Sequence, residues 1–475
     1  MKKMLLFISL IVVVSCSKES ADLEFEQQSA VKYDITSLKI NPESSAITSD
    51  EAINVVKLVD MMGKASTKSA LKQIEDVVTL SDENGAPLIY AVNYTDNQGY
   101  KLVSAIKDYY PILAMVDRGT FNDEVHKTGA SVLLDEYINS IGNADKLPSE
   151  VRQGFRKLWQ QFEKRDKEIP VSTKLNEFDT FIVNTLQSWN NDENVHDFYT
   201  LQEAESRLPA SLYSTFCSYA QGVGHPDYDY MTYSYVVESI DRQEVDEDDY
   251  LMETQWHQEY PYNTSMEYLG LGQYQYPGCN AIALAQIMKY HQWPNTYPWS
   301  NMPNSMITLG EQTTLPDFIK DIAEEIKLDN YPINYSTPDK CLTALVNEYG
   351  YYGTKSSHNR QSVITSINRN RPVYMCGFPT TGDGHTWVCD GFEVDRRQMI
   401  YKLYVIATSH ILEYVLACDP YQGEILSEGY FFHMNWGQRL SSNGWYLEGP
   451  LAVDDIYYNN NRIDITDIRN STELN

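Results

Sequence analysis

The feature that most constrains this chain is an apolar helix that must begin at a cysteine. Pro277 and Gly278 interrupt the backbone, the run Cys279–His291 consists mostly of good helix formers, and Pro294 ends the segment. A thiol at residue 279 would meet unpaired backbone N–H groups and the positive end of the helix dipole, and both lower a cysteine pKa. Because free cysteines are among the most buried residues, an inert core thiol is the competing interpretation.

The first 16 residues predict an export signal. Two lysines precede an apolar run that is too short to span a bilayer, and the run ends at Ser15-Cys16. The pattern resembles the lipobox of bacterial lipoproteins, which implies a lipidated Cys16 as mature N-terminus; a plain signal peptide is the alternative. We therefore expect a flexible tether over residues 17–45 and a location at the bacterial outer membrane or cell surface, with release after processing.

Charge and cysteine usage exclude several classes of function. The formal net charge of −29 argues against nucleic acid or an anionic lipid surface as a partner, because both require a basic face. The cysteines beyond Cys16 show no CxxC or framework spacing, so a disulfide scaffold is not expected, and Cys376 and Cys389 lie in strand-like runs typical of core thiols. Histidines and cysteines show no metal-ligand spacing, so we expect no metal and no organic cofactor.

Hydrophobic periodicity predicts several domains in the 475 residues. An amphipathic segment from Asp50 to about Leu71 and strands at 87–94, 100–105 and 111–116 predict a small α+β domain over residues 46–125. Helical patterns at 131–141 and 151–164 open an extension over residues 126–245, which ends in the acidic stretch Glu238–Glu253, interpreted as an exposed linker. Residues 246–470 combine the cysteine helix, a helix near 315–326 and β-rich sequence from 372 onward.

A nucleophilic thiol needs a base, and His385 is the best candidate because a loop with Gly384 delivers it to the start of an alternating strand. A solvated or core histidine is the alternative interpretation. Asn435 lies in an apolar strand, where a carboxamide is costly without a partner, so it is a candidate to orient the imidazole. Gln258 is available as an oxyanion donor beside the Cys279 N–H.

Four segments strengthen these assignments by resemblance. Residues 256–263, 278–294, 384–391 and 433–437 look like the signature blocks of the streptopain family of secreted bacterial cysteine peptidases, in the family's order. Residues 99–105 and 111–119 look like the inhibitory prosegment of that family. The resemblance implies these site residues: Cys279 as nucleophile, His385 as base and acid, Gln258 in the oxyanion hole, Asn435 and Trp436 supporting the histidine, and Gly384 lining the cleft.

The resemblance also implies an α+β fold, in which a small α+β prodomain precedes a papain-like two-lobed catalytic domain with a helical lobe and an antiparallel β lobe. The function we expect is an exported, lipid-anchored zymogen of a cysteine endopeptidase. Its partners would be protein or peptide substrates, its own prodomain as inhibitor, and a membrane through the lipid at Cys16. Cleavage between about 165 and 250 would then free the peptidase from the membrane unless the two parts stay associated.

Three departures from the family pattern leave alternatives open. Glu259 replaces a glycine after the oxyanion glutamine, Gln438-Arg439-Leu440 replaces a tryptophan and glycines, and an extra segment around 396–416 could fold as a hairpin over the site. One alternative is therefore a catalytically impaired lipoprotein that binds peptides or acts as an inhibitor. Another is a transferase that uses the same cysteine and histidine on glutamine or acyl donors.

Overall fold

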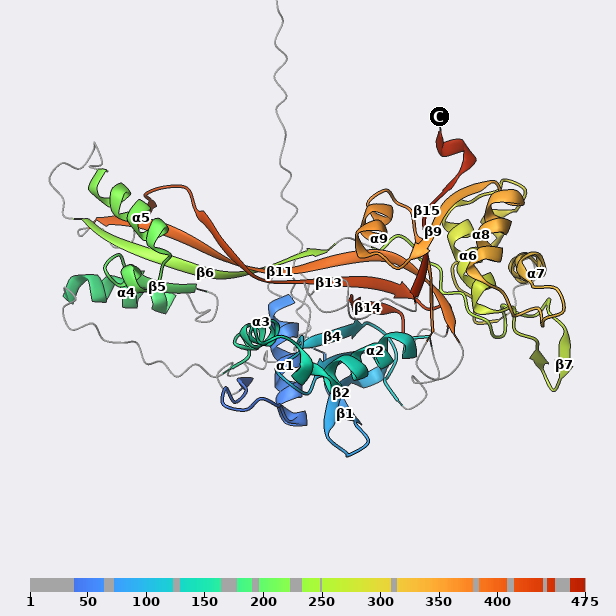
Figure 1. Cartoon of the computed structure of the whole chain (residues 1–475), viewed down its shortest axis with the longest axis horizontal. Coiled ribbons are helices and arrows are strands. Elements are labelled where there is room, and N and C mark those ends of the chain that lie inside the picture. Colours follow the sequence, from blue (N-terminus) through green and yellow to red (C-terminus); the bar gives the residue numbers. More distant parts are fainter. Residues whose placement is uncertain are drawn as a thin grey trace, which may run out of the picture.

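The computed structural model describes residues 38–63, 72–122, 129–163, 177–189, 196–222, 233–247, 250–308, 314–378, 384–407, 414–438, 442–448 and 462–474. Mixed helix and sheet run through all of them, as predicted (Figure 1). Cys16 and most of the predicted tether lie outside the described residues. Within the described part of the chain, no helix is both long and apolar enough to cross a membrane.

The N-terminal α+β unit is an antiparallel sheet with one helix against it. Helix α1 (Ser49–Gly63) packs on strands β1 (Ile74–Ser81), β2 (Pro87–Tyr94), β3 (Tyr100–Ser104) and β4 (Ile112–Val116), which pair in that order. The last three strands match the predicted strands, and α1 matches the first part of the predicted helical segment, whose residues 64–71 lie outside the described residues. Sequence periodicity missed β1, because this edge strand buries little more than Leu80 and shows no clear alternation.

Two further helices complete this part of the chain, as their apolar spacing predicts. Helices α2 (Ser131–Gly142) and α3 (Ser149–Trp159) bury side chains such as Leu134 and Trp159 in the same apolar cluster as strands β2 to β4. The cluster continues into the C-terminal half through Trp387, Phe432 and Trp436. The prodomain was expected over residues 46–125 only, but α2 and α3 of the expected extension share its apolar cluster, so we use the name prodomain for residues 38–163.

The C-terminal half has a helical side and a sheet side. Helices α6 (Cys279–His291), α7 (Leu315–Ile326) and α8 (Pro338–Asn347) share one apolar cluster, and the small hairpin of β7 (Tyr268–Gly270) and β8 (Gln273–Tyr274) precedes them. The sheet side is antiparallel and is crossed by α9 (Arg360–Ile367). Its strands are β9 (Tyr351–Ser357), β10 (Val373–Gly377), β11 (His385–Ala407), β12 (Tyr414–Leu416), β13 (Tyr421–Asn435), β14 (Gly444–Leu447) and β15 (Arg462–Asn470).

The prodomain sheet and the catalytic sheet are continuous. Strand β4 pairs antiparallel with β14, with Val116 opposite Gly444 and Ala114 opposite Tyr446. A Cβ at residue 444 would lie 2.6 Å from the Met115 carbonyl oxygen, so a glycine is what allows this close approach. The prodomain is therefore attached to the catalytic half through backbone pairing as well as side chains.

The long hairpin of β11 and β13 differs from the sequence expectation. It does not fold over the site: its outer part, residues 393–407 and 421–430, extends away from α6 to the opposite end of the molecule (Figure 1). We call this outer part the arm. Residues 238–247 of the acidic stretch that was expected to be an exposed linker belong instead to strand β6 (Tyr233–Glu247), which pairs with the arm from Glu393 to Ala407.

An outer lobe forms around the arm from the residues that sequence could not assign. Strand β5 (His196–Thr200) pairs with β6, α5 (Ala210–Gly222) covers one face, and α4 (Glu177–Trp189) covers the other. Alternate residues of β6 divide between the two faces, with Val237 packing under α5 and Val236 under α4. Residues 236–240 are buried, and backbone pairing with the arm continues through Glu247, which explains why an acidic sequence is strand rather than linker.

Candidate active site

The nucleophile candidate stands where the helix begins. Gly278 has a φ of 93°, and a Cβ there would lie 2.7 Å from the Asn334 carbonyl oxygen, so both conformation and space require a glycine. Helix α6 then starts at Cys279, which is half-buried and not in a disulfide. The first backbone N–H groups of a helix have no acceptor within it, so they favour a negative charge on this thiol.

Cys279 and His385 form one titrating pair. Burial acts to raise the pKa of the Cys279 thiol, but the hydrogen bond and charge of His385, together with hydrogen bonds from Thr386, outweigh it and lower that pKa. Burial acts to lower the pKa of His385, yet the hydrogen bond and charge of Cys279, and the Trp436 carbonyl, raise it. The two shifts favour a thiolate beside an imidazolium, which is the reactive form of the pair.

The orientation of His385 comes from the backbone. Its Nε2 lies 2.8 Å from the Trp436 carbonyl oxygen, which accepts a hydrogen bond from the protonated nitrogen. The imidazole is parallel to the Trp387 ring at a centroid distance of 6.3 Å, and the Trp436 ring lies at the same distance. The two tryptophan rings lie 4.8 Å from each other, so they form a pair on one side of His385, and one ring nitrogen is left to face Cys279.

Asn435 does not take the place expected for it beside the imidazole. Its Nδ2 donates to the Thr254 carbonyl at 2.7 Å and to Gln286 Oε1 at 3.0 Å, and its Oδ1 accepts from the Gly437 N–H at 3.3 Å. The carboxamide thus fixes the turn that presents the Trp436 carbonyl. Of the two residues expected to support the histidine, Trp436 contacts it directly, through its backbone carbonyl, and Asn435 acts through the turn.

Asn280 is a site residue that sequence reasoning missed. Its buried Oδ1 accepts from Tyr374 Oη and, at 3.0 Å, from Thr386 Oγ1, so the first turn of α6 is tied to β10 and β11. These bonds fix the position of Cys279 relative to His385. The available signal was an asparagine inside an otherwise apolar helix, where an unpartnered carboxamide would be costly.

The roles predicted for Gln258 and Gly384 stay predictions. Gln258 is half-buried in the segment before α6, and its place in the oxyanion hole stays a prediction. Gly384 precedes His385, and a Cβ there would lie 2.5 Å from the Phe378 ring, so a larger residue would require that exposed ring to move. The backbone N–H of Glu259 donates to His257 Nδ1 at 3.2 Å.

Among the described residues, no cluster of three or more His, Cys, Asp or Glu side chains is suited to a metal ion.

The prodomain reaches the histidine itself. Gly129, just before α2, lies so close to the imidazole that a Cβ there would be 1.9 Å from His385 Cδ2. The Gly129 N–H donates to Gln438 Oε1 at 2.9 Å, so the departure at residue 438 provides an acceptor for the prodomain. Val132 packs in the space above Gly377, where a Cβ would meet its methyl at 2.8 Å. Backbone from the prodomain therefore occupies space that a substrate would need beside the base.

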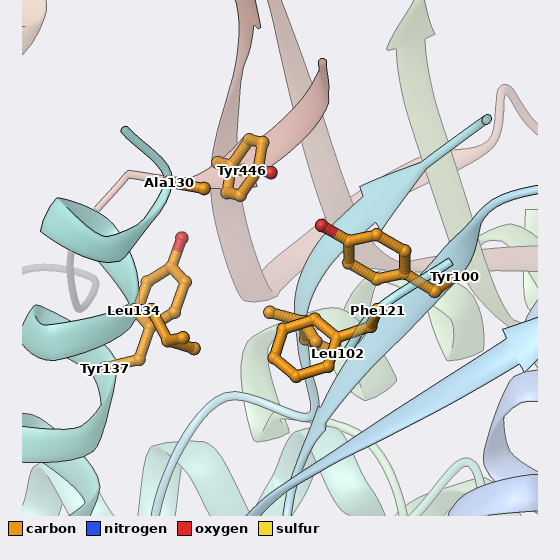
Figure 2. Close-up of a pocket in the computed structure, with 7 residues that line it drawn as sticks. All are labelled: Tyr100, Leu102, Phe121, Ala130, Leu134, Tyr137 and Tyr446. Carbon is orange, nitrogen blue, oxygen red and sulfur yellow. The ribbon is translucent and has the colours of Figure 1, made fainter. Parts of the chain in front are cut away.

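Next to this contact, mostly apolar side chains of the prodomain and of β14 line a small space that we call the seam (Figure 2). Tyr446 of β14 faces side chains of the prodomain, and its ring also contacts Trp436 edge-on at 5.3 Å. Through Trp436, the seam continues from the pair of tryptophans beside His385. The residues that line it are Tyr100, Leu102, Phe121, Ala130, Leu134, Tyr137 and Tyr446.

A cysteine at a helix start, paired with a histidine on an adjoining sheet, defines the class of cysteine-dependent acyl-transfer enzymes to which cysteine peptidases belong. Residues 256–296 and 295–446 match the Peptidase C10 family model, and residues 44–141 match the model described as Spi protease inhibitor. The C-terminal half is thus similar to the Peptidase C10 family, and the part before it is similar to an inhibitor of the Spi type.

The chain is also similar to individual relatives of known name. The chain is 27% identical over 178 residues to the thiol protease/hemagglutinin PrtT of Porphyromonas gingivalis, covering 30% of this chain and 20% of the relative. It is 25% identical over 219 residues to streptopain of Streptococcus pyogenes, covering 37% and 46%. The chain thus spans less than half the length of these curated relatives. A prointerpain A fragment of Prevotella intermedia aligns with 83% of this chain and 98% of its own at 14% identity and a TM-score of 0.41.

Proposed function

We propose that this protein is the zymogen of a cysteine endopeptidase, with Cys279 as nucleophile and His385 as acid and base. The observation that carries the proposal is the thiol–imidazole pair at the start of α6, with the prodomain backbone at Gly129 packed against the imidazole. A reactive pair and an occupied site in one chain are what a latent peptidase requires. Protein and peptide substrates follow from the same proposal.

The chemistry follows from the geometry. The Cys279 thiolate attacks the scissile carbonyl carbon, and the oxyanion accepts hydrogen bonds from the Cys279 N–H and, as predicted, from Gln258. The His385 imidazolium gives its proton to the amine nitrogen as the C–N bond breaks, which leaves an acyl-thioester. Water, deprotonated by His385, then attacks the thioester and restores the thiol. The Trp436 carbonyl holds the ring in position through both proton transfers.

The test compares wild type with Cys279→Ser and His385→Ala. After the prodomain is removed by an engineered cut, wild type should hydrolyse casein and should react with an epoxide thiol probe at Cys279. Cys279→Ser should lose both properties, and His385→Ala should lose hydrolysis. Equal hydrolysis in all three proteins would overturn the proposal. A labelled Cys279 without hydrolysis would favour the peptide-binding alternative, and amide products with an added amine would favour the transferase.

Export and anchoring complete the proposal. The sequence up to Cys16 supports lipidation, which would place the peptidase at the bacterial outer membrane or cell surface. Because the lipid would be carried by the prodomain, a cut that frees the prodomain would also free the peptidase from the membrane. Labelled palmitate should be incorporated into wild type in cells and not into Cys16→Ala. Equal labelling of the two proteins would contradict the anchor.

A further inference from the structure

We propose that the arm is a second docking surface for the prodomain, remote from the active site, with Arg397 as its anchor. The inference rests on the proposed function in one respect, namely that the prodomain is the inhibitor. Arg397 follows His385 along β11, and at about 3.3 Å of rise per strand residue the two lie roughly 40 Å apart. The contact is therefore separate from the one that Gly129 makes at the imidazole.

Arg397 caps a helix of the prodomain. Its Nη1 donates to the carbonyl oxygens of Lys157 and Leu158, at 3.4 and 3.5 Å, in the last turn of α3. The last carbonyls of a helix have no donor within it and carry the negative end of its dipole, so a guanidinium is well suited to this position. Only 6% of Arg397 is exposed, and a buried cation needs such partners.

Next to the contact between Arg397 and α3, a tyrosine of the prodomain fits into a space left by a glycine of the arm. Tyr110 of the prodomain sits over Gly429 of β13, where a Cβ would lie 2.4 Å from the tyrosine oxygen. Its hydroxyl donates to Asp395 Oδ2 at 3.3 Å, and its ring contacts Phe431 edge-on at 6.1 Å. The absence of a side chain at residue 429 is thus what lets the tyrosine enter the arm. Two neighbouring strands contribute to the dock, Asp395 and Arg397 from β11 and Gly429 from β13.

Two contacts on one prodomain reinforce each other. When Gly129 moves away from His385, the arm keeps the prodomain near the site at a high effective concentration, so the inhibitory contact re-forms quickly. Release then requires both contacts to open together. The arm coincides with the extra segment that departs from the family pattern, and this role gives that segment a function in latency.

The test uses the full chain with Cys279→Ser, so that binding is measured without activity. A specific protease site is introduced after Glu163, the chain is cut, and separation of the N-terminal fragment is followed by size-exclusion chromatography over time. We expect Arg397→Ala and Gly429→Ala each to speed release by about tenfold or more, as expected for the loss of a buried charged hydrogen bond or a steric clash. Arg396→Ala is the matched control, because Arg396 pairs with Glu428 of the arm itself at 2.6 Å.

Release at the wild-type rate in both Arg397→Ala and Gly429→Ala would overturn the inference. Because either change could unfold the arm, hydrogen exchange of the β6–β11 amides is measured in each variant. Tyr110→Phe, which removes one hydroxyl from the prodomain side, tests the dock without touching the arm, and unchanged release there would count against it as well. Peptidase activity is assayed separately in the Cys279 background. Failure of that assay would reject the proposed function and leave the docking result intact.

Discussion

Glu136 of the prodomain helix α2 lies 3.5 Å from the Nε of Arg462 in the catalytic sheet, at the edge of a buried charge cluster. Arg462 donates two hydrogen bonds to Glu448, and His358 bridges Glu448 at 2.6 Å and Asp464 at 2.8 Å. Two cations and two anions already balance within the catalytic half. The carboxylate of Glu136 is therefore surplus negative charge that the prodomain brings.

This relationship predicts that prodomain binding weakens as pH rises. Burial, opposed by Arg462 and helped by Glu448 and Asp135, raises the pKa of Glu136 from 4.5 to about 7 in the complex. Docking therefore takes up a proton: it is strongest below pH 4.5 and weakens, by up to about tenfold per pH unit, until pH passes about 7. His358, whose pKa is raised to about 9, stays charged throughout that window.

Release of the cut prodomain from the Cys279→Ser protein, measured between pH 4.5 and 8, checks the sign. Glu136→Gln should keep the tight, low-pH behaviour across the range, because it cannot ionise. A release rate that falls as pH rises, or a pH dependence that survives in Glu136→Gln, would contradict the assignment to this carboxyl.

His385 should control the reactivity of Cys279. The hydrogen bond and charge of His385 lower the thiol pKa against the effect of burial, so His385→Ala should move the alkylation midpoint to higher pH. The measurement is the rate of iodoacetamide modification against pH after the prodomain is removed. Buried Cys341, whose pKa is raised to about 12, serves as the internal unreactive thiol. An unchanged alkylation midpoint in His385→Ala would show that His385 does not lower the pKa of the Cys279 thiol.

Asn435→Ala should lower stability and turnover together. The change leaves the Thr254 carbonyl and Gln286 without a partner, which costs about 1–3 kcal/mol for buried polar groups. Turnover should fall because the turn that presents the Trp436 carbonyl loosens, while KM changes little. Chemical denaturation and steady-state kinetics measure the two effects. Loss of activity at full stability would instead indicate that Asn435 acts directly on the imidazole.

The outer lobe should stay with the peptidase when the prodomain is cut away. Strand β6 pairs with the arm from Glu393 to Ala407, and Val237 is fully buried against Tyr401 and Leu403. After engineered cuts behind Glu163 and between residues 247 and 250, the fragments 164–247 and 250–475 should elute together under native conditions. Val237→Asp should expose the lobe to trypsin, whereas Asp197→Ala, on the exposed side of β5, should not. Equal digestion of both variants would argue against the lobe as a folded unit.

Local pattern was sufficient for much of the fold. A break at Pro277-Gly278 before apolar helix formers placed α6, and alternation placed β2, β3 and β4, because each depends on near neighbours in the chain. Strand β6 was misread since its acidic residues are typical of linkers, and its partner strand lies some 160 residues further along. Only the tertiary pairing buries Val236 and Val237 on opposite faces.

The sequence by itself determined which side chains are available for chemistry: a thiol at a helix start, a histidine at a strand start and the motifs that resemble a peptidase family. The tertiary structure decided how they are held. In it, the Trp436 carbonyl orients His385, Asn280 ties the helix start at Cys279 to the sheet, and Gly129 lies against the base. Backbone carbonyls and glycines do this work, and they carry no side-chain signal that a sequence pattern could reveal.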